Sequence, residues 1–393
     1  MKKLYTLSLL SICYIFTNAQ MGTWLQKADL PLPLNVWKTE AASFQINGKG
    51  YLATGNTGST QTIDTWEYEP SNDTWTQKAN FTGTARKGAS GFALNGKGYM
   101  VGGTNTTTYY NECWEYDPIA NSWLQKASFT GIGRYRAVGF AIDSLGYYGT
   151  GSDLNVNALS DFYCYSATTN TWSQKQSLPT TRREAMGFSV GGKGYIGSGL
   201  STNQQWYEYD PVANTWLQKA NFPNLVASGG WGFSIGGYGY VYYWINSGNN
   251  FYQYNPTTNT WVAKANFPGA GRYYAKGFTF GNIAYMGTGG QSGNGTYYKD
   301  WYEYNSGLVR VEENISENSF SVYPNPSNGK FVIDTKLTEG EIVVYTIQGE
   351  KVFNQQISKS SNQQIDLSNQ AKGIYFVQIN SEQGSVTKKI VIQ

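Results

Sequence analysis

Trp123-Leu124-Gln125-Lys126 is one of six W-x-x-K stretches that decide the fold of this 393-residue chain. The tryptophans that open them are Trp24, Trp75, Trp123, Trp172, Trp216 and Trp261, so successive copies lie 51, 48, 49, 44 and 45 residues apart. A repeat of about fifty residues is typical of a β-propeller, in which each copy forms one blade. Because a repeated unit builds a scaffold and does not by itself encode chemistry, function has to be sought where the copies differ.

The first half of each copy predicts two strands joined by a tight turn. A phenylalanine is followed seven residues later by a tyrosine in all six copies, and turn dipeptides such as Asn47-Gly48 and Gly191-Gly192 lie between them. Asparagine and glycine supply the positive φ angles that a two-residue hairpin needs. The pairs are Phe44/Tyr51, Phe92/Tyr99, Phe140/Tyr147, Phe188/Tyr195, Phe233/Tyr240 and Phe278/Tyr285.

The second half of each copy predicts two more strands, and it shows how the ring closes. The third strand carries aromatic residues two positions apart, as in Trp66 and Tyr68, which predicts one face buried against the next blade. The sixth copy stops at Tyr304-Asn305 and has no fourth strand, while Trp24-Leu-Gln-Lys27 stands alone at the N-terminus. We therefore expect the N-terminal strand to complete the sixth blade, because closure removes exposed sheet edges.

These features resemble the kelch repeat. Glycine pairs such as Gly102-Gly103 end the second strand, Tyr116-Asp117-Pro118 and Tyr209-Asp210-Pro211 end the third, and a tryptophan opens the fourth. The resemblance covers residues 22–305 and departs in the third copy, where Ala167 replaces the proline. It implies an all-β chain whose main domain is a six-bladed kelch-type β-propeller.

The N-terminus is typical of an export signal, predicted over residues 1–19. Lys2 and Lys3 precede an apolar run from Leu4 to Phe16, and small residues follow before Gln20. No other stretch is apolar enough to predict a transmembrane segment. The formal charge is +3, and removal of the two signal lysines leaves the propeller region close to neutral, which argues against a nucleic-acid partner.

Cysteine and histidine usage limits the chemistry. Cys113 and Cys164 remain after removal of the signal and fall on the same side of equivalent strands in successive blades, so we expect two unpaired thiols. The chain contains no histidine, which excludes histidine-assisted triads and histidine-ligated zinc or copper. We expect no catalytic residue, no metal and no cofactor.

The C-terminal part predicts a polar linker over 306–318 and a small Ig-like β-sandwich over 319–393. Strands are expected at 331–334, 341–345, 374–379 and 389–393. The segments Tyr323-Pro-Asn-Pro326, Gly373-Ile-Tyr-Phe-Val-Gln378 and Lys388-Lys-Ile-Val-Ile-Gln393 resemble the type A sorting domain of the type IX secretion system of Bacteroidetes. That resemblance implies the secretion machinery as a partner, passage through the periplasm, and a secreted or outer-surface location. A sugar-binding or adhesive β-sandwich is the alternative interpretation of this tail.

Candidate ligand-binding residues gather at the start of each innermost strand. Basic side chains stand six residues before the repeat phenylalanine in five copies, and a second set follows two residues later, where the period of two aims side chains in a similar direction. Guanidinium groups, carboxylates and aromatic rings suit an anionic or polyhydroxylated ligand at one channel mouth. The candidates are Lys38, Glu40, Arg86, Arg134, Arg136, Arg182, Glu184, Trp231, Arg272 and Tyr274.

Two interpretations of the basic ring stay open from the sequence, because a residue repeated in most blades can also hold the ring together. The favoured function is a secreted or surface binding protein without catalytic activity, which recognises a glycan or a protein with one propeller face. An enzyme resembling the sialate mutarotases among kelch propellers is the first alternative, with Glu40 or Glu184 as acid or base. A purely adhesive or structural surface protein is the second. Copper radical oxidases are excluded because they need histidine ligands.

Overall fold

The computed structural model divides the chain into two compact units, 1–308 and 309–393, and each is described by itself. The predicted signal peptide (1–19) and residues 308–318 of the predicted linker lie outside the described residues. The structure describes residues 22–33, 36, 38–58, 60–200, 204–224, 229–245, 248–291, 296–307, 320–335, 340–346, 350–357, 362–381 and 384–393.

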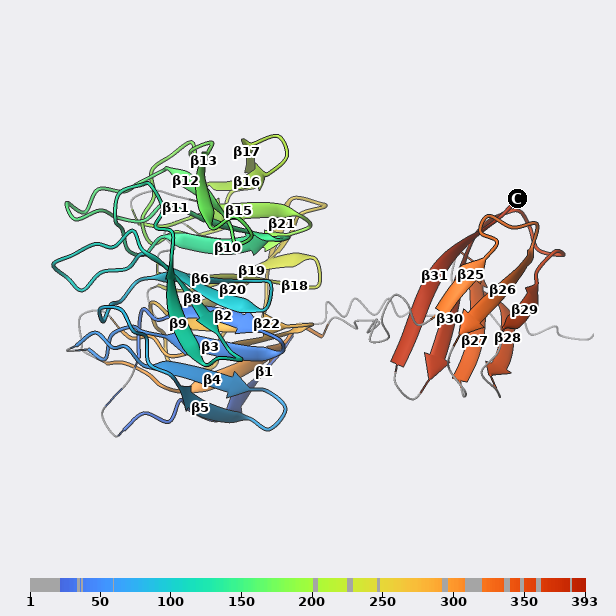
Figure 1. The fold of residues 1–393 in the computed structure, drawn as a ribbon, viewed down its shortest axis with the longest axis horizontal. Helices are drawn as coiled ribbons and strands as arrows, with labels where there is room; N and C mark the ends of the chain where they lie inside the picture. Colours follow the sequence, from blue (N-terminus) through green and yellow to red (C-terminus); the bar gives the residue numbers. More distant parts are fainter. Residues whose placement is uncertain are drawn as a thin grey trace, which may run out of the picture. The chain divides into compact units, whose positions relative to one another are not determined.

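The first unit consists of six four-stranded antiparallel sheets, which Figure 1 shows from the side. Contacts between successive innermost strands arrange these sheets in a ring. In the first five blades the strands follow one another in sequence order. Blade one is β2 (Ala42–Ile46), β3 (Lys49–Ala53), β4 (Thr65–Glu69) and β5 (Thr74–Lys78); blade two is β6 (Ser90–Leu94), β7 (Lys97–Val101), β8 (Cys113–Asp117) and β9 (Ser122–Lys126); blade three is β10 (Val138–Ile142), β11 (Leu145–Gly149), β12 (Phe162–Ser166) and β13 (Thr171–Lys175).

The remaining blades confirm the predicted closure. Blade four is β14 (Met186–Val190), β15 (Lys193–Gly197), β16 (Trp206–Asp210) and β17 (Thr215–Lys219); blade five is β18 (Trp231–Ile235), β19 (Tyr238–Ile245), β20 (Gly248–Asn255) and β21 (Thr260–Ala263). Blade six is β22 (Lys276–Phe280), β23 (Ile283–Gly287), β24 (Trp301–Asn305) and the N-terminal β1 (Thr23–Lys27). Trp24 pairs with Tyr304 in the β1–β24 ladder. The innermost strands contact one another in succession, and β22 contacts β2.

The repeated residues form the predicted hairpins and the layers between blades. Asn47 and Gly48 have φ angles of 49° and 79°, which match the turn that the sequence predicts. Phe44 faces Tyr51 across the β2–β3 ladder, and the two rings stack with their centroids 5.5 Å apart. Both rings reach the next blade, where they lie near Tyr116. Burial of these aromatic layers is therefore the main stabilising term of the ring.

The two cysteines are buried and unpaired, as expected. Cys113 begins β8 in blade two, and Cys164 lies within β12 in blade three. Both sulfurs are enclosed by aromatic and aliphatic side chains of separate core clusters. Burial raises the pKa of both thiols, so neither is activated as a nucleophile.

The second unit is a small Ig-like sandwich of two antiparallel sheets. The predicted strands form parts of β26, β27, β30 and β31, and three further strands accompany them. One core cluster, with Phe331, Val344 and Ile379 among its members, joins the sheets. The strands are β25 (Phe320–Tyr323), β26 (Lys330–Thr335) and β29 (Gln363–Asp366) in one sheet, and β28 (Lys351–Ile357), β27 (Gly340–Thr346), β30 (Gly373–Ser381) and β31 (Gly384–Ile392) in the other.

Candidate functional site

The basic ring predicted from the sequence is buried inside the blades. The exposed fraction is 1% for Arg86 and 0% for the other four members. Each residue lies just before the innermost strand of its blade, and its side chain points into the interior of that same blade. The members are Lys38, Arg86, Arg134, Arg182 and Arg272.

Each ring cation donates to the backbone oxygen of a residue after the second strand of its own blade. In blade three, Arg134 donates to the backbone oxygens of Ile132 at 3.0 Å and Thr150 at 3.1 Å, and both guanidinium ends bind Asp161. The acceptor after the second strand has a positive φ, which turns its carbonyl toward the cation. The five acceptors are Thr54, Gly102, Thr150, Ser198 and Thr288.

Aromatic rings complete the enclosure of the ring cations. The guanidinium carbon of Arg86 lies 3.8 Å from the centroid of Tyr110, and that of Arg272 lies 4.1 Å from the centroid of Tyr298. Cation–π contacts of this kind stabilise a desolvated charge. The five side chains therefore tie loops to strands within each blade. A carboxylate matches the charge of four of them, and Arg182 is bound by the neutral Gln205 instead.

The next ring position turns toward the propeller axis. Its six residues all have left-handed backbone angles, from 53° at Arg136 to 67° at Gly88. The expectation that a period of two aims both rings in a similar direction is wrong, because a positive φ interrupts the alternation of an extended strand. The six residues are Glu40, Gly88, Arg136, Glu184, Gly229 and Tyr274.

Backbone hydrogen bonds connect this second ring from blade to blade. The amide of Gly88 donates to the oxygen of Glu40 at 2.9 Å, and that of Arg136 donates to the oxygen of Gly88 at 2.7 Å. The series continues through Glu184 and Gly229, and Tyr274 donates to Gly229 at 2.6 Å. A side chain on Gly229 would meet the ring of Tyr274 at 2.8 Å, so the glycine leaves room for side chains that cross the axis.

Arg136 lies at the centre of a charge cluster that we call the mouth cluster: Glu40, Lys87, Arg136, Glu184 and Tyr274. Arg136 binds both oxygens of Glu40 at 2.9 Å and donates to Glu184 in the next blade. Its guanidinium carbon lies 4.1 Å from the centroid of Tyr274. Lys87 lies 3.7 Å from Glu40. Two carboxylates and two cations make the cluster neutral overall.

The cluster fixes the protonation of its buried groups. Burial alone raises the pKa of Glu40, but the neighbouring charges of Arg136 and Lys87 outweigh it and hold that pKa below its ordinary value. Burial would lower the pKa of Arg136, yet its carboxylate neighbours raise it. The phenol of Tyr274 also has a raised pKa, first because of burial. Near neutral pH, Glu40 is therefore ionised and is a poor proton donor.

A pocket of about 230 Å³ lies beside the mouth cluster. Tyr135 and Tyr273 directly precede two lining residues, Arg136 and Tyr274, and each half-buried ring contacts a second one: the centroids of Tyr109 and Tyr135 are 5.2 Å apart, and those of Trp244 and Tyr273 are 4.9 Å apart. We call these four residues the aromatic rim. The pocket is lined by Thr39, Glu40, Asn56, Lys87, Arg136, Tyr274, Gly290, Gln291 and Tyr297.

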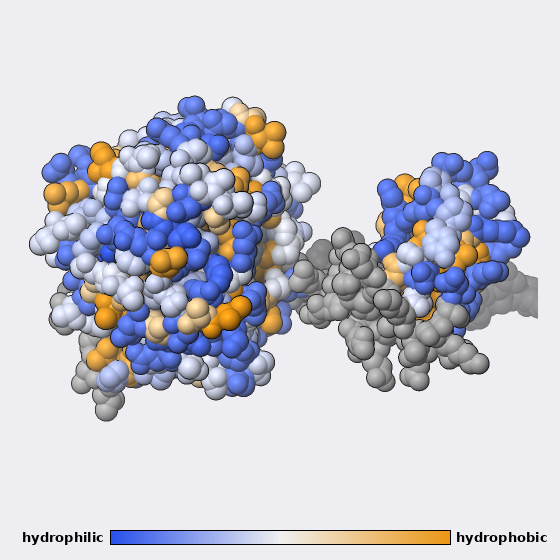
Figure 2. Space-filling model, viewed as in Figure 1, coloured by the Kyte–Doolittle hydropathy of each residue, from blue (hydrophilic) through white to orange (hydrophobic). Residues whose placement is uncertain are grey.

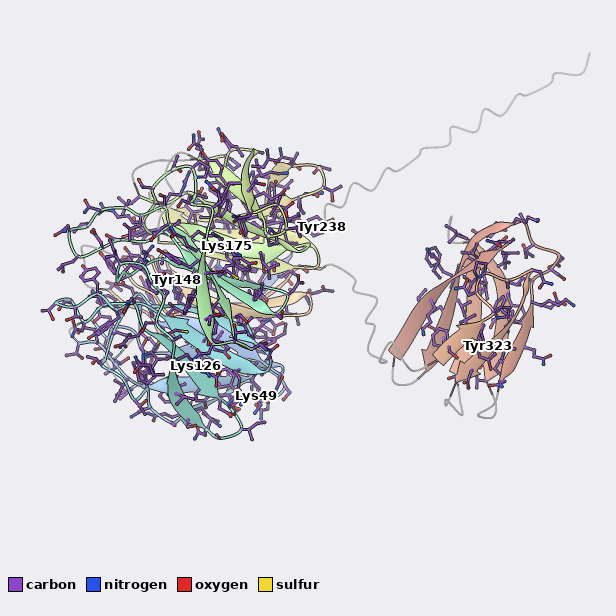
Figure 3. All side chains as sticks on the ribbon, turned by 45° about the horizontal axis from the view of Figure 1, so that its top comes forward. Lys49, Lys126, Tyr148, Lys175, Tyr238 and Tyr323 are labelled. Atoms are coloured by element: carbon purple, nitrogen blue, oxygen red, sulfur yellow. The ribbon has the colours of Figure 1, made fainter. Side chains whose placement is uncertain are left out.

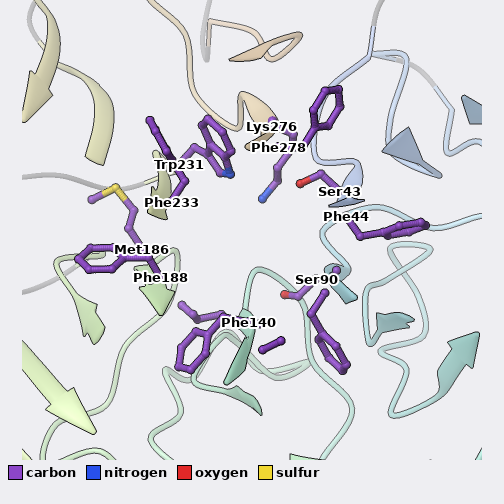
Figure 4. A pocket seen from close by; sticks show the side chains of 18 of the residues that line it. Ser43, Phe44, Ser90, Phe140, Met186, Phe188, Trp231, Phe233, Lys276 and Phe278 are labelled. Atoms are coloured by element: carbon purple, nitrogen blue, oxygen red, sulfur yellow. The ribbon is translucent and has the colours of Figure 1, made fainter. Parts of the chain in front are cut away.

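Trp231 lies deeper than the predicted mouth. It begins β18, stacks on Phe233 with centroids 4.2 Å apart, and borders the central channel shown in Figure 4. The structure thus brings Glu40, Arg136, Glu184 and Tyr274 together. Trp231 lies in the central channel instead, and the five ring cations are buried within their blades.

Sequence reasoning missed Lys87, Asn56 and Lys276. Lys87 lies between the two ring positions, where the other copies carry Thr39, Tyr135, Arg183, Ser228 and Tyr273. Because this position varies and Arg183 is also basic, the sequence does not distinguish Lys87. Lys276 stands two residues after Tyr274, where no other blade has a charge. Asn56 follows the second strand of blade one and lines the pocket because its backbone pairs with that of Thr39 in an isolated β-bridge. No sequence pattern predicts this pairing.

Figure 2 shows no large apolar patch on the visible face, because hydrophobic residues (orange) are scattered among hydrophilic and intermediate ones (blue and white). Within the described ranges, no helix is long and apolar enough to cross a membrane. Those same ranges contain no group of three or more histidine, cysteine, aspartate or glutamate side chains arranged to hold a metal ion.

Comparisons with known proteins match the two units separately. Residues 321–393 match the family described as Secretion system C-terminal sorting domain. Among solved structures, the one described as "Structure of YjhT" matches with a TM-score of 0.60 and 16% identity, over 70% of this chain and 95% of that chain. None of the curated proteins matches the chain. At 16% identity the structural likeness shows the fold alone.

The sorting domain indicates where the protein goes. A tail of this family directs a chain to the secretion machinery, so the protein is secreted or placed at the outer cell surface.

Proposed function

We propose that this chain, a six-bladed kelch-type propeller joined to a type IX secretion sorting domain, is an exported binding protein that recognises a glycan at the mouth pocket. The observation that carries the proposal is the pocket of about 230 Å³ beside the neutral mouth cluster, where the half-buried rings of Tyr135 and Tyr273 adjoin the lining residues Arg136 and Tyr274 in the chain. Catalysis is not part of this proposal.

Charge matching favours a polyhydroxylated ligand over an acidic one at this mouth. Arg136 is already bound by Glu40 and Glu184, and the five ring cations are buried in their own blades. A hydroxyl-rich ligand can both donate to carboxylates and accept from Lys87, Asn56 and Gln291. The aromatic rim supplies apolar faces on which a sugar ring can lie.

A glycan array with the mature secreted protein tests the proposal. We expect neutral glycans to bind, and the affinity, measured by isothermal titration calorimetry, to fall about tenfold or more in Tyr135→Ala and Tyr273→Ala. The matched control is Tyr238→Ala, because this half-buried tyrosine begins β19 directly after the Gly236-Gly237 turn, away from the mouth (Figure 3).

Two results would contradict the glycan proposal. Binding that is unchanged in both rim variants would remove the mouth as the site. The absence of any glycan binding, together with capture of a protein ligand by the same face, would favour protein recognition instead.

A second candidate is an enzyme of the sialate mutarotase type, because two carboxylates and an arginine converge at one mouth. The lowered pKa of Glu40 argues against it as an acid at neutral pH. Proton NMR of sialic acid anomers decides: faster anomerisation with the wild-type protein than with Glu184→Gln would support the enzyme.

A further inference from the structure

The central channel contains a chamber of about 260 Å³ beyond the mouth cluster. A small pocket lined by Glu40, Arg136 and Glu184 lies on the mouth side of this chamber and shares Lys276 with it. The innermost strands of all six blades line it, as Figure 4 shows, and it extends toward the hairpin ends of these strands, where Gln45 is exposed. Lys276 is the one charged residue among the described residues that line this chamber. The chamber is therefore positive, in contrast to the neutral mouth.

Lys276 differs from the other cations near the axis because it has no ion pair or hydrogen bond within the described part of the chain. Arg136 and Lys87 both contact Glu40, and the five ring cations are held in their blades. The amine of Lys276 instead points into the open centre of the channel in Figure 4. A partly desolvated charge without a partner is unfavourable, so it favours a counter-ion.

Two further donors stand beside this amine. Trp231 occupies the same strand position in blade five as Lys276 does in blade six, and its indole nitrogen faces the channel (Figure 4). The hydroxyl of Ser43 also faces the channel there. Ser90 is already engaged, since it donates to the oxygen of Ala137 at 2.6 Å. The free groups that line the chamber are thus a cation and hydrogen-bond donors. The carboxylates of Glu40 and Glu184, which share a small pocket with Lys276, are bound by Arg136.

The remaining walls are apolar. Met186 lies next to Trp231, at the equivalent position of the neighbouring blade four, and repeat phenylalanines such as Phe188 and Phe233 lie behind both. The chamber is slightly smaller than the usual 300–1,000 Å³ range for drug-sized ligands, which limits the occupant to a small molecule.

We propose that the central channel binds a small organic carboxylate, with its anionic group at the amine of Lys276 and its apolar part against Trp231 and Met186. This site is distinct from the mouth pocket and does not depend on glycan binding there.

The protonation of Lys276 agrees with this role. Burial lowers the pKa of the amine, Glu40 opposes that effect, and Arg136 adds to it. A bound anion reverses the shift, so binding and protonation support each other. Affinity for the carboxylate should fall as the pH rises through the lowered pKa of Lys276.

Saturation-transfer NMR and calorimetry with benzoate, pyruvate and acetate test the proposal on the mature protein. We expect benzoate to bind, neutral benzamide to bind at least tenfold more weakly, and Lys276→Met to lose at least tenfold in benzoate affinity. The matched control is Lys175→Met, because Lys175 lies on the outermost strand β13 (Figure 3).

Folding and binding are read separately. The thermal midpoint of Lys276→Met should equal or exceed that of the wild type, because an unpaired buried cation is removed. Benzoate affinity that is equal in Lys276→Met and the wild type overturns the proposal. So does the failure of all three carboxylates to bind, or equal binding of benzamide and benzoate.

Discussion

The side-chain oxygen of Asn121 accepts the backbone N–H of Ala79 at 2.9 Å, which ties the second blade to the first. The same oxygen accepts the hydroxyl of the buried Tyr116 at 2.8 Å. Asn121 also has a φ of 49°, so one residue shapes the turn and links two blades. Asp73, Asn170, Asn214 and Asn259 repeat this arrangement in other blades.

Replacement of Asn121 by glycine should separate these two roles. Glycine keeps the positive φ without strain but removes both hydrogen bonds, which leaves the hydroxyl of Tyr116 without its acceptor. We expect a loss of about 2 kcal/mol in the free energy of unfolding, seen as a fall of roughly 4–8 °C in the thermal midpoint.

The control for that experiment is Asn121→Asp, because Asp73 makes the same contacts in blade one. The aspartate variant should melt close to the wild type. If Asn121→Gly also melts with the wild type, the link between blades contributes nothing measurable.

Removal of the Trp24 side chain should destabilise the ring at its closure. The indole of Trp24 donates to the oxygen of Ala265 in the fifth blade at 2.8 Å and packs on Phe267 and Tyr304. We expect Trp24→Ala to lower the stability by about 3 kcal/mol and Trp24→Phe by less, as measured by urea unfolding. Equal stability of the alanine variant and the wild type would mean that blade six holds without this contact.

The blades could be predicted because their signals are local and repeated. A phenylalanine, a turn and a tyrosine lie within eight residues, and the six copies support the same interpretation. Because the sixth copy lacks a fourth strand, the N-terminal strand with Trp24 could be assigned to it. The links between blades were only partly visible. Asn121 was recognised as a turn residue, but its bond to Ala79 depends on how two blades face each other.

The ion pairs within the mouth cluster could not be predicted from the sequence. Glu40 and Arg136 lie 96 residues apart and in blades one and three, so their contact depends on the size of the whole ring. The left-handed backbone at both positions, which turns them to the axis, has no signal in the residue types glutamate and arginine. For the same reason the sequence could not show that the ring cations point into their blades while the residues of the second ring point to the axis.

Arg134→Ala should separate a structural from a ligand-binding role of the basic ring. The variant leaves Asp161 and the oxygen of Thr150 without their cation, so we expect a loss of about 3–5 kcal/mol in stability. Arg134→Lys should lose less, because Lys38 fills this place in blade one. Below the melting range, glycan affinity should be unchanged. Lost glycan binding with an unchanged thermal midpoint would show instead that the ring contacts the ligand.

The pairing of Glu40 with Arg136 should make the stability of the propeller depend on pH. The pKa of Glu40 is lower in the folded protein than its ordinary value of 4.5, so its contribution is present above pH 4.5 and is lost as the pH falls through the lowered value. The thermal midpoint of the wild type should therefore fall more steeply below pH 4.5 than that of Glu40→Gln.

Arg136→Met should show the opposite trend, because it leaves Glu40 and Glu184 buried without their common cation. At pH 7 we expect a loss of about 3 kcal/mol, since an unpaired buried charge is strongly unfavourable. At pH 4 Glu40 of this variant, which has lost the cation that lowers its pKa, can take up a proton, so the deficit relative to the wild type should shrink. The double variant Arg136→Met/Glu40→Gln should recover part of the stability at pH 7. A deficit of Arg136→Met that stays constant from pH 7 to pH 4, with no recovery in the double variant, would mean that packing of the side chain and not its charge holds the mouth together.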